Sequence, residues 1–263
     1  MDPTSDTLEL MIAAARAAGA GLARHFAKVS SLQIRRKGPA DFVSAADEEA
    51  EAAVRAILSA RRPDYGFMGE ESVYRAGADP TRNWMVDPLD GTTNFLRGLP
   101  LFAVNIALEE AGAITAGVTF NPITGDLFTA AKGGGAFHNG APIRVSGHKG
   151  VTDSVLAVGI PFAAKPRHDR FIAEMTRLTP HVAGIRRLGA AALDLAYVAA
   201  GVFDAYWEHA TNAWDIAAGA ILVTEAGGVV TGSNGAPFDA RAGHILACTP
   251  GVQPELLKAL RPT

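Results

Sequence analysis

The apolar and polar positions near the start of the chain follow a helical period. Apolar side chains in residues 5–28 recur at steps of three and four, which predicts an amphipathic helix. A second helix is expected to begin near Ser44, because "SAAD" matches a capping box and the glutamates after it favour the positive end of a helix. Pro63 would end this helix. The apolar stripe of the first helix consists of Leu8, Met11, Ile12, Ala15, Leu22 and Phe26.

The middle of the chain has the pattern of an antiparallel meander. "LFAVNIALEE" and "AITAGVTF" are two strand-like runs joined by Ala111 and Gly112, which predicts a hairpin. "NPITGD", "KGGG" and "HNG" predict turns around the strand-like "LFTAA" and "AFHN". Before the meander, "NWMV" predicts a strand that ends at Asp87. The apolar surplus of "LFAVNIALEE" indicates either a subunit interface or a central strand covered by helices on both faces.

After about residue 150 the pattern alternates between strands and helices. "SVLAVGI", "VAGIRR" and "FDAYWE" predict strands, whereas "RHDRFIAEMTRL" and "AALDLAYVAAG" predict helices. "WDIAAGAILVTEAGG" predicts a helix with Gly227 at its C-terminal cap, and a last helix is expected near residues 254–260. This alternation around a large meander predicts a layered α+β or α/β sandwich in two halves. We expect the halves to comprise residues 1–147 and 148–263.

Composition narrows the class of protein. The 263 residues are 48% apolar with a mean hydropathy of +0.13, which is typical of a well-packed globular protein. The net charge of −3 and the pI of about 6.2 show no electrostatic footprint for nucleic acid. The single cysteine, Cys248, lies in the apolar run "HILACT" and is expected to be a buried strand residue. With no signal-peptide pattern and no membrane-length apolar run, we expect a cytoplasmic protein without membrane contact.

Three separated segments place acidic side chains where strands or helices give way to turns. "FMGEES" contributes Glu70 and Glu71, "VDPLDGTT" contributes Asp87 and Asp90, and "AWDIAAG" contributes Asp215. Taken singly, each of these acids could have an ordinary structural role in place of a functional one. Asp215 could be a first-turn acid of a helix, and the glutamates could be a solvated loop pair.

The pair in "DPLDGTT" is more specific, because it lies between an apolar strand and a predicted helix start. Buried carboxylates that face each other repel unless a cation lies between them. The Leu89 carbonyl can face the same space as Asp87 and Asp90, Gly91 permits close approach, and the free N–H groups at Thr92 and beyond suit a phosphate. Donors that are all oxygen suit Mg²⁺ rather than zinc. The segment therefore indicates either solvated turn residues or a magnesium site.

"GEES", "DPLDGTTNF" and "WDIAAG" together resemble the inositol monophosphatase family of Mg²⁺-dependent, lithium-sensitive phosphatases. The resemblance continues through "KGPADFVSAAD", "RRLGAAALDLAYVAAG" and "FDAYWE", in the family's order over most of the chain. It implies an αβαβα sandwich with a large antiparallel sheet in the first half and a mixed sheet in the second. It also implies two to three Mg²⁺ per site, inhibition by Li⁺, a small phosphorylated polyol as substrate, and a homodimer.

The resemblance assigns metal ligands residue by residue. Glu70 and Asp87, with the Leu89 carbonyl, correspond to the ligands of the first metal. Asp87, Asp90 and Asp215 correspond to those of the second, so that Asp87 bridges the two ions. A third, weaker ion would lie near Glu70.

The resemblance also assigns catalytic and substrate-binding residues. Asp47 would pair with Thr92, and these two, with Glu70, would orient the attacking water. Glu208 would accept hydrogen bonds from the hydroxyls of the substrate, with backbone contacts beside it. The implied substrate-binding residues are Asp90, Gly91, Thr92, Gly189, Ala191 and Glu208.

Alternatives to this function remain open to different degrees. A haloacid dehalogenase-type phosphatase is excluded, because its nucleophilic aspartate would stand where this chain has Pro88. A regulatory binding protein without catalysis is disfavoured, because every implied metal ligand is present. Inositol 1-phosphate is the favoured substrate, and fructose 1,6-bisphosphate, histidinol phosphate and 3′-phosphoadenosine 5′-phosphate are the alternatives. Ala190 departs from the Ser or Thr frequent in relatives, and His209 is expected to be a surface histidine or a substrate contact.

Overall fold

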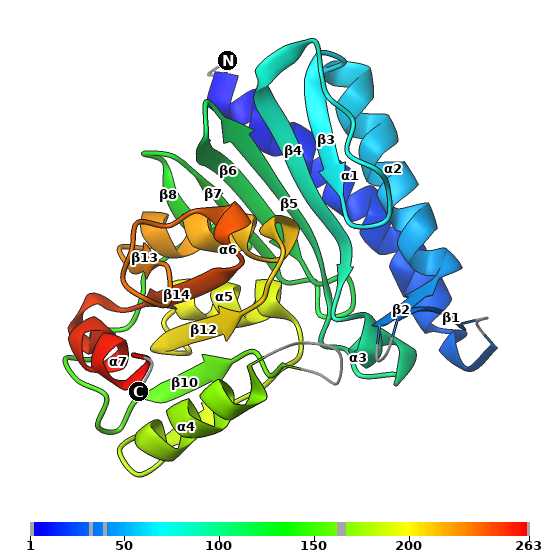
Figure 1. Ribbon diagram of the computed structural model, residues 1–263. Helices are drawn as coiled ribbons and strands as arrows, with labels where there is room; N and C mark the ends of the chain where they lie inside the picture. The colour runs from blue at the N-terminus through cyan, green and yellow to red at the C-terminus, as the bar shows by residue number, and fades with distance from the viewer. Residues whose placement is uncertain (1–2, 32–33, 39–40, 162–166, 262–263) are drawn as a thin grey trace.

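The computed structural model describes residues 3–31, 34–38, 41–161 and 167–261 of the chain (Figure 1). Residues 39 and 40 of the segment "KGPADFVSAAD" lie outside this part. No helix of the described residues is long and apolar enough to cross a membrane.

Both helices predicted at the start of the chain are present. Helix α1 (Pro3–Phe26) leads through a short 3-10 turn, η1 (Val29–Ser31), and the hairpin of β1 (Ile34–Gly38) and β2 (Asp41–Ser44) into α2 (Ala45–Arg61). The predicted capping box is confirmed: Ser44 Oγ accepts a hydrogen bond from the Ala46 N–H, and the Asp47 carboxylate accepts one from the Ser44 N–H.

The first sheet has seven strands that follow one another in chain order. The predicted hairpin at Ala111 and Gly112 is confirmed, and both residues have a positive φ, of 49° and 82°, as a tight two-residue turn requires. The strands are β3 (Tyr65–Gly69), β4 (Asp79–Asp90), β5 (Ala103–Glu110), β6 (Ala113–Phe120), β7 (Leu127–Ala131), β8 (Gly135–His138) and β9 (Ala141–Ile143).

Two features of this sheet differ from the prediction. β3 pairs with β4 in parallel, because residues 70–78 carry the chain back to the end at which β3 began, so the sheet is antiparallel only from β4 onward. β4 also does not end at Asp87 but continues to Asp90. Its pairing with β5 shifts register between these two aspartates, so Pro88, which has no N–H, lies where the ladder is already interrupted.

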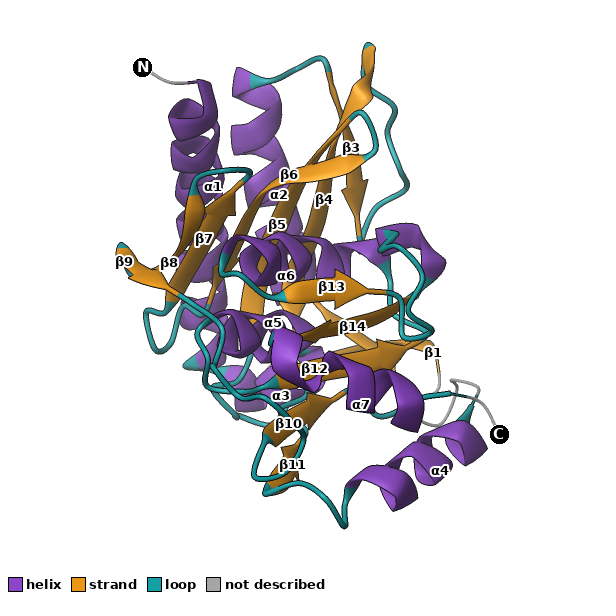
Figure 2. Cartoon of the chain, turned by 90° about the vertical axis from the view of Figure 1, so that its left-hand side faces the viewer, coloured by secondary structure: helices purple, strands orange, loops and turns teal. Residues whose placement is uncertain are grey.

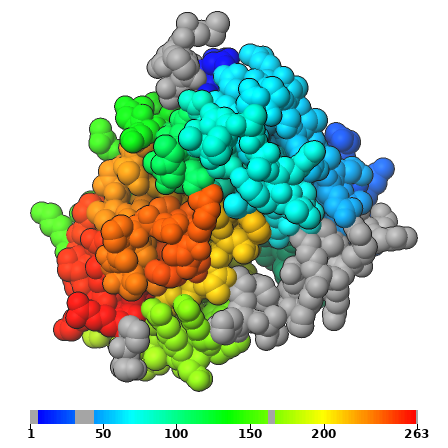
Figure 3. All heavy atoms as spheres, turned by 45° about the horizontal axis from the view of Figure 1, so that its top comes forward, coloured from blue at the N-terminus to red at the C-terminus, as the bar shows by residue number. Residues whose placement is uncertain are grey.

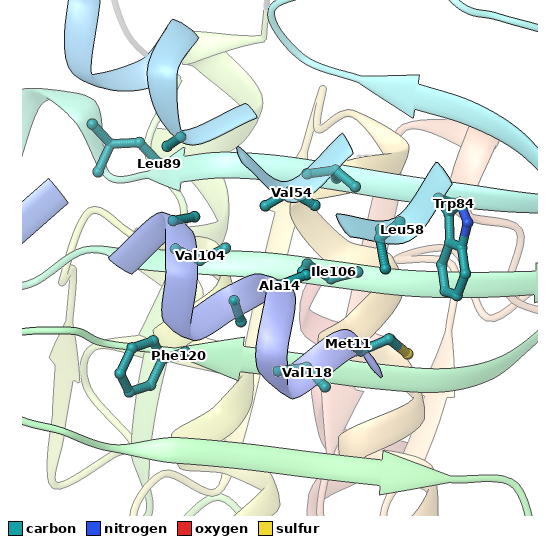
Figure 4. Close-up of a cluster of buried hydrophobic side chains, with 14 of the residues drawn as sticks. Met11, Ala14, Val54, Leu58, Trp84, Leu89, Val104, Ile106, Val118 and Phe120 are labelled. Carbon is teal, nitrogen blue, oxygen red and sulfur yellow. The ribbon is translucent and has the colours of Figure 1, made fainter. Parts of the chain in front are cut away.

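One face of the first sheet is covered by α1 and α2. Figure 4 shows the resulting core, in which side chains from both helices meet those of β4, β5 and β6. Met11, Leu58, Trp84 and Ile106 are each at most 1% exposed. Burial of this apolar surface is the main stabilising contribution to this half of the protein.

The second sheet is mixed, as predicted, with the strand order β11-β10-β12-β14-β13. β10 pairs in parallel with β11 and β12, whereas β14 pairs in antiparallel with β12 and β13. Cys248 is fully buried in β14, which confirms the prediction. The strands are β10 (Val155–Val158), β11 (Gly184–Arg186), β12 (Ala205–His209), β13 (Val229–Thr231) and β14 (His244–Cys248).

Helices alternate with the sheets in five layers, which confirms the αβαβα prediction (Figures 1 and 2). α5 (Ala191–Ala199) and α6 (Ala213–Glu225) lie between the sheets, and α4 (His168–Leu178) and α7 (Gln253–Ala259) cover the far face of the second. β5 is thus covered by α1 on one face and by α6 on the other, which explains its apolar surplus. The division between residues 147 and 148 stays a prediction. The remaining elements are α3 (Thr92–Leu96), η2 (Ala240–Ala242) and η3 (Pro250–Val252).

Candidate active site

A cavity of about 400 Å³ lies between the two halves of the chain. Figure 3 shows the surface hollowed between the yellow atoms of the second half and the cyan and teal atoms of the first. Of the site residues predicted from the sequence, all but Asp47 line it. These are Glu70, Asp87, Leu89, Asp90, Gly91, Thr92, Gly189, Ala191, Glu208 and Asp215.

The end of β4 delivers Asp87 and Asp90 to the cavity. Asp87 Oδ1 accepts a hydrogen bond from the Leu89 N–H at 3.0 Å, which holds the turn around Pro88. Gly91 then reverses the chain with a φ of 93°, and a Cβ at this position would lie 2.9 Å from the Leu101 carbonyl oxygen. Only glycine combines this φ with this close approach. α3 begins directly afterwards at Thr92, as predicted.

Two helix starts bring further groups to the same space. Asp215 is in the first turn of α6, where its Oδ2 accepts the Asn212 N–H at 2.7 Å in a capping box. Asp215 is therefore both a capping residue of α6 and an acid of the cavity. Asp90 Oδ2 accepts the Ala192 N–H at 2.7 Å, which joins the end of β4 to the start of α5.

The acids of the cavity repel one another. Burial raises the pKa of Asp87 well above its ordinary value, and the charge of Glu70 is the next cause. Burial also raises the pKa of Asp215 well above its ordinary value, although the hydrogen bond from the Asn212 backbone opposes this. The pKa of Asp90 is raised to about 7, again chiefly by burial, while the Ala192 N–H lowers it. Such shifts show that negative charge here lacks compensation.

The donor set fits a hard cation. Among the described residues that line the cavity, six are carboxylates and one, Arg187, is basic, and none of them is a histidine or a cysteine. Within the described residues, no three acidic, histidine or cysteine side chains are already arranged around one point as a metal site. The fit therefore rests on the chemistry of the donors, which are oxygen only and carry excess negative charge. The carboxylates belong to Glu70, Asp87, Asp90, Asp194, Glu208 and Asp215.

Asp47 lies behind the cavity wall, where it contacts Thr92. Thr92 Oγ1 is 3.3 Å from Asp47 Oδ1 and 3.1 Å from the Leu89 carbonyl oxygen, and its single proton can be donated to one of them at a time. Asp47 is 1% exposed and also accepts hydrogen bonds from the N–H and the hydroxyl of Ser44, both at 2.8 Å. Thr92 is thus held by a carboxylate that is itself fixed.

The expectation for His209 was wrong. This side chain is 8% exposed, and its Nε2 lies 2.9 Å from Oε1 of the fully buried Glu174 on α4. It is neither a surface histidine nor one of the residues that line the cavity. Glu208 lies within β12, as the strand predicted from "FDAYWE" implies, so Glu208 and His209 project to opposite faces of the second sheet.

Several lining residues were not predicted from the sequence: Arg187, Asp194, Tyr206 and Asn212. Asp194 is 2% exposed and its Oδ1 has no hydrogen-bond partner. A signal for Asp194 was available, because it follows Ala191 by three residues and would lie on the same helical face. Tyr206 precedes Glu208 by two residues, the spacing that places strand residues on one face.

Comparison with known proteins identifies the chain. The model of the inositol monophosphatase family matches residues 4–262. The chain belongs to this family.

The inositol-1-monophosphatase of Caulobacter vibrioides is 50% identical over 95% of this chain and 99% of its own. The extragenic suppressor protein suhB of Bartonella henselae, a crystal structure, has a TM-score of 0.94 at 46% identity over 97% of this chain and 98% of its own. The Nus factor SuhB of Pasteurella multocida is 40% identical over 97% and 96%. Family membership and relatives named inositol-1-monophosphatase make this protein a phosphoric monoester hydrolase.

Proposed function

We propose that the cavity hydrolyses a small phosphorylated polyol, inositol 1-phosphate first, with Mg²⁺ as cofactor. The observation that carries this proposal is the convergence of Glu70, Asp87, Asp90 and Asp215 from three separate segments on one cavity, where burial and mutual repulsion raise the pKa of the aspartates. A cation removes that repulsion, and a phosphate ester brings further negative charge that needs one.

Two to three Mg²⁺ ions would be held by these four carboxylates together with the Leu89 carbonyl. When bound, Mg²⁺ would neutralise the negative charge of the phosphoryl and leaving groups and lower the pKa of a water molecule bound to it. The resemblance assigns Asp87 as a ligand of two ions, and the charges of Glu70, Asp90 and Asp215 all raise its pKa.

The residues of the chain would orient the reactants. Thr92, donating its proton to Asp47, presents its oxygen lone pairs to one proton of the attacking water, and Glu70 accepts the other. Gly91 and Thr92 line the same cavity, and their backbone N–H groups would contact the phosphoryl oxygens. No nucleophilic side chain is needed for direct attack by water.

Substrate selection would occur at the other side of the cavity. Glu208 would accept hydrogen bonds from hydroxyl groups, beside the backbone of Gly189 and Ala191. The 50% identical relative named inositol-1-monophosphatase supports inositol 1-phosphate as the first choice. The test is phosphate release with and without Mg²⁺ from inositol 1-phosphate, fructose 1,6-bisphosphate, histidinol phosphate and 3′-phosphoadenosine 5′-phosphate. A preference for any of the last three would reject the proposed substrate, and release that does not depend on Mg²⁺ would reject the cofactor.

A regulatory role beside catalysis is a second candidate, favoured by the relatives named Nus factor SuhB. A variant without turnover separates the two roles. Asp87→Asn expressed in place of the natural protein should abolish a phenotype that depends on turnover and retain one that depends on binding alone.

We also propose a homodimer that works in the cytoplasm. The support is family membership, because the apolar surplus of β5 is accounted for by α1 and α6 and no longer points to an interface. Light scattering at micromolar protein should give twice the mass of one chain, and a monomer mass would reject the dimer.

A further inference from the structure

One buried side chain in the cavity wall has no part in the proposed reaction. Tyr206 is fully buried, lines the cavity, and lies two residues before Glu208 on β12. Both side chains therefore project from the same face of the strand. The Tyr206 hydroxyl donates a hydrogen bond to Glu208 Oε2.

We propose that Tyr206, with the space left by Gly159, is the positioning element that holds the Glu208 carboxylate toward the hydroxyls of the substrate, and that this pair of residues sets selectivity for polyol phosphates. This inference rests on the proposed function, in which Glu208 contacts the substrate.

The electrostatics of the cavity explain why Glu208 needs a donor. The charge of Glu208 helps to raise the pKa of Asp194, after burial and the charge of Asp90. Repulsion is mutual, so the charge of Asp194 acts on Glu208 as well. Burial raises the pKa of Tyr206 well above its ordinary value, so the phenol stays a neutral donor to the Glu208 carboxylate.

Gly159 provides the space into which the carboxylate is held. A Cβ at this position would lie 2.0 Å from Cδ and Oε2 of Glu208, so the carboxylate lies against the bare backbone of the glycine. The Gly159 N–H donates to the Trp207 carbonyl at 3.1 Å, which fixes this backbone beside β12. The φ of Gly159 is not positive, so alanine would change the available space without backbone strain.

The test uses Tyr206→Phe, which removes only the donor, and Gly159→Ala, which displaces the carboxylate by steric contact. Each should raise the KM for inositol 1-phosphate about five- to tenfold, which is less than the effect of losing a whole charge-assisted hydrogen bond because the carboxylate is displaced and not removed, and leave kcat within about twofold. With p-nitrophenyl phosphate, which has no hydroxyls to recognise, kcat and KM should stay within about twofold. Tyr197→Phe is the matched control. Tyr197 packs against Phe128 and Phe203 outside the cavity, and both substrates should be unaffected.

A double variant shows whether Tyr206 acts through Glu208. In a Glu208→Ala background, Tyr206→Phe should change the KM for inositol 1-phosphate by less than about twofold. An equal further loss in that background, an unchanged KM in Tyr206→Phe alone, or equal losses on both substrates would each overturn the inference. If the wild type hydrolyses inositol 1-phosphate but these variants keep its KM, this inference is wrong and the proposed function stands. If the wild type does not hydrolyse it, the proposed substrate and this inference fall together.

Discussion

Replacing Asp87 by asparagine should reverse the order of stability between variant and wild type, depending on whether Mg²⁺ is present. Asp87 is 3% exposed, and its charge is opposed by burial and by the neighbouring acids. The hydrogen bond from the Leu89 N–H to Oδ1 is one that an asparagine carbonyl can also accept. The substitution therefore removes the charge and keeps the local turn.

The size of the effect follows from the burial of that charge. An uncompensated buried charge is unfavourable by about 3 to 5 kcal/mol. A buried amide with an unpaired group is unfavourable by about 1 to 3 kcal/mol. Without metal, the free energy of unfolding of the variant should thus be about 2 kcal/mol higher than that of the wild type. For a chain of this size this corresponds to a rise in Tm of about 4 to 8 °C.

The difference should grow with pH. An acid with a higher pKa in the folded than in the unfolded chain contributes stability that is complete below the unfolded pKa and is lost as pH rises through the folded pKa. The metal-free wild type therefore loses stability from about pH 4 upward, through the pKa of Asp90 at about 7 and beyond. The variant lacks the contribution of Asp87 to this loss, so the two proteins should differ little at about pH 4, and the difference should grow as pH rises.

Mg²⁺ should reverse this order. An ion at a hundredfold excess over its Kd stabilises the protein that binds it by about 2.7 kcal/mol. The wild type should gain this stabilisation, whereas Asp87→Asn should gain little and should lose Mg²⁺-dependent turnover. Thermal unfolding in EDTA and in saturating Mg²⁺, with phosphate release measured on the same samples, tests both statements.

Asp204→Asn is the matched control for this experiment. Asp204 is 4% exposed and lies outside the cavity, where it accepts hydrogen bonds from the Ser146 hydroxyl at 2.5 Å and from the Val155 N–H at 2.7 Å. This variant should be less stable than the wild type both in EDTA and in Mg²⁺, and its Mg²⁺-induced shift should be unchanged. The reasoning would be refuted if Asp87→Asn melted below the wild type in EDTA at high pH, or if it kept wild-type turnover.

Three further predictions concern inhibition, selectivity and packing. In the proposed mechanism, Li⁺ would replace a Mg²⁺ held by Asp90 and Asp215 after ester cleavage and would slow phosphate release. Steady-state kinetics should then show uncompetitive inhibition, and purely competitive inhibition would contradict this. Glu208→Gln should raise the KM for inositol 1-phosphate roughly tenfold by losing charge-assisted hydrogen bonds, with p-nitrophenyl phosphate turnover barely changed, and equal losses on both would show an effect on the metal centre or the fold. Gly117→Ala should lower the free energy of unfolding by about 1 to 3 kcal/mol, because its Cβ would lie 2.8 Å from the Ala218 carbonyl oxygen of α6. Gly147→Ala, which meets no atom within 4 Å, should leave Tm unchanged in the same denaturation assay.

Features set by local sequence were predictable. The capping box at Ser44 and the hairpin at Ala111 depend on a few adjacent residues whose side chains or φ values decide the backbone. The convergence of the three acidic segments was predictable only through the resemblance, since nothing in their spacing states that Glu70, Asp87 and Asp215 share one cavity.

Features set by tertiary contacts were not predictable in the same way. The parallel pairing of β3 depends on the path of residues 70–78, which no periodicity encodes. The burial of His209 depends on Glu174, which is 35 positions earlier in the chain and lies on another layer. A lone histidine beside a strand end gives no sign of such a partner, and so surface exposure was the ordinary expectation.

The ambiguity of the acids at helix starts has a structural resolution. In both capping boxes one carboxylate oxygen accepts a hydrogen bond from the N–H of the N-cap residue. Asp47 Oδ2 accepts it from the Ser44 N–H at 2.8 Å, and Asp215 Oδ2 accepts it from the Asn212 N–H at 2.7 Å. A carboxylate has a second oxygen, and in Asp47 that oxygen, Oδ1, lies 3.3 Å from the Thr92 hydroxyl. Capping therefore fixes the position of an acid without using all of its acceptor capacity. For Asp215, the capping hydrogen bond and a role in the cavity are therefore compatible. The capping hydrogen bond holds the Asp215 side chain at the cavity wall.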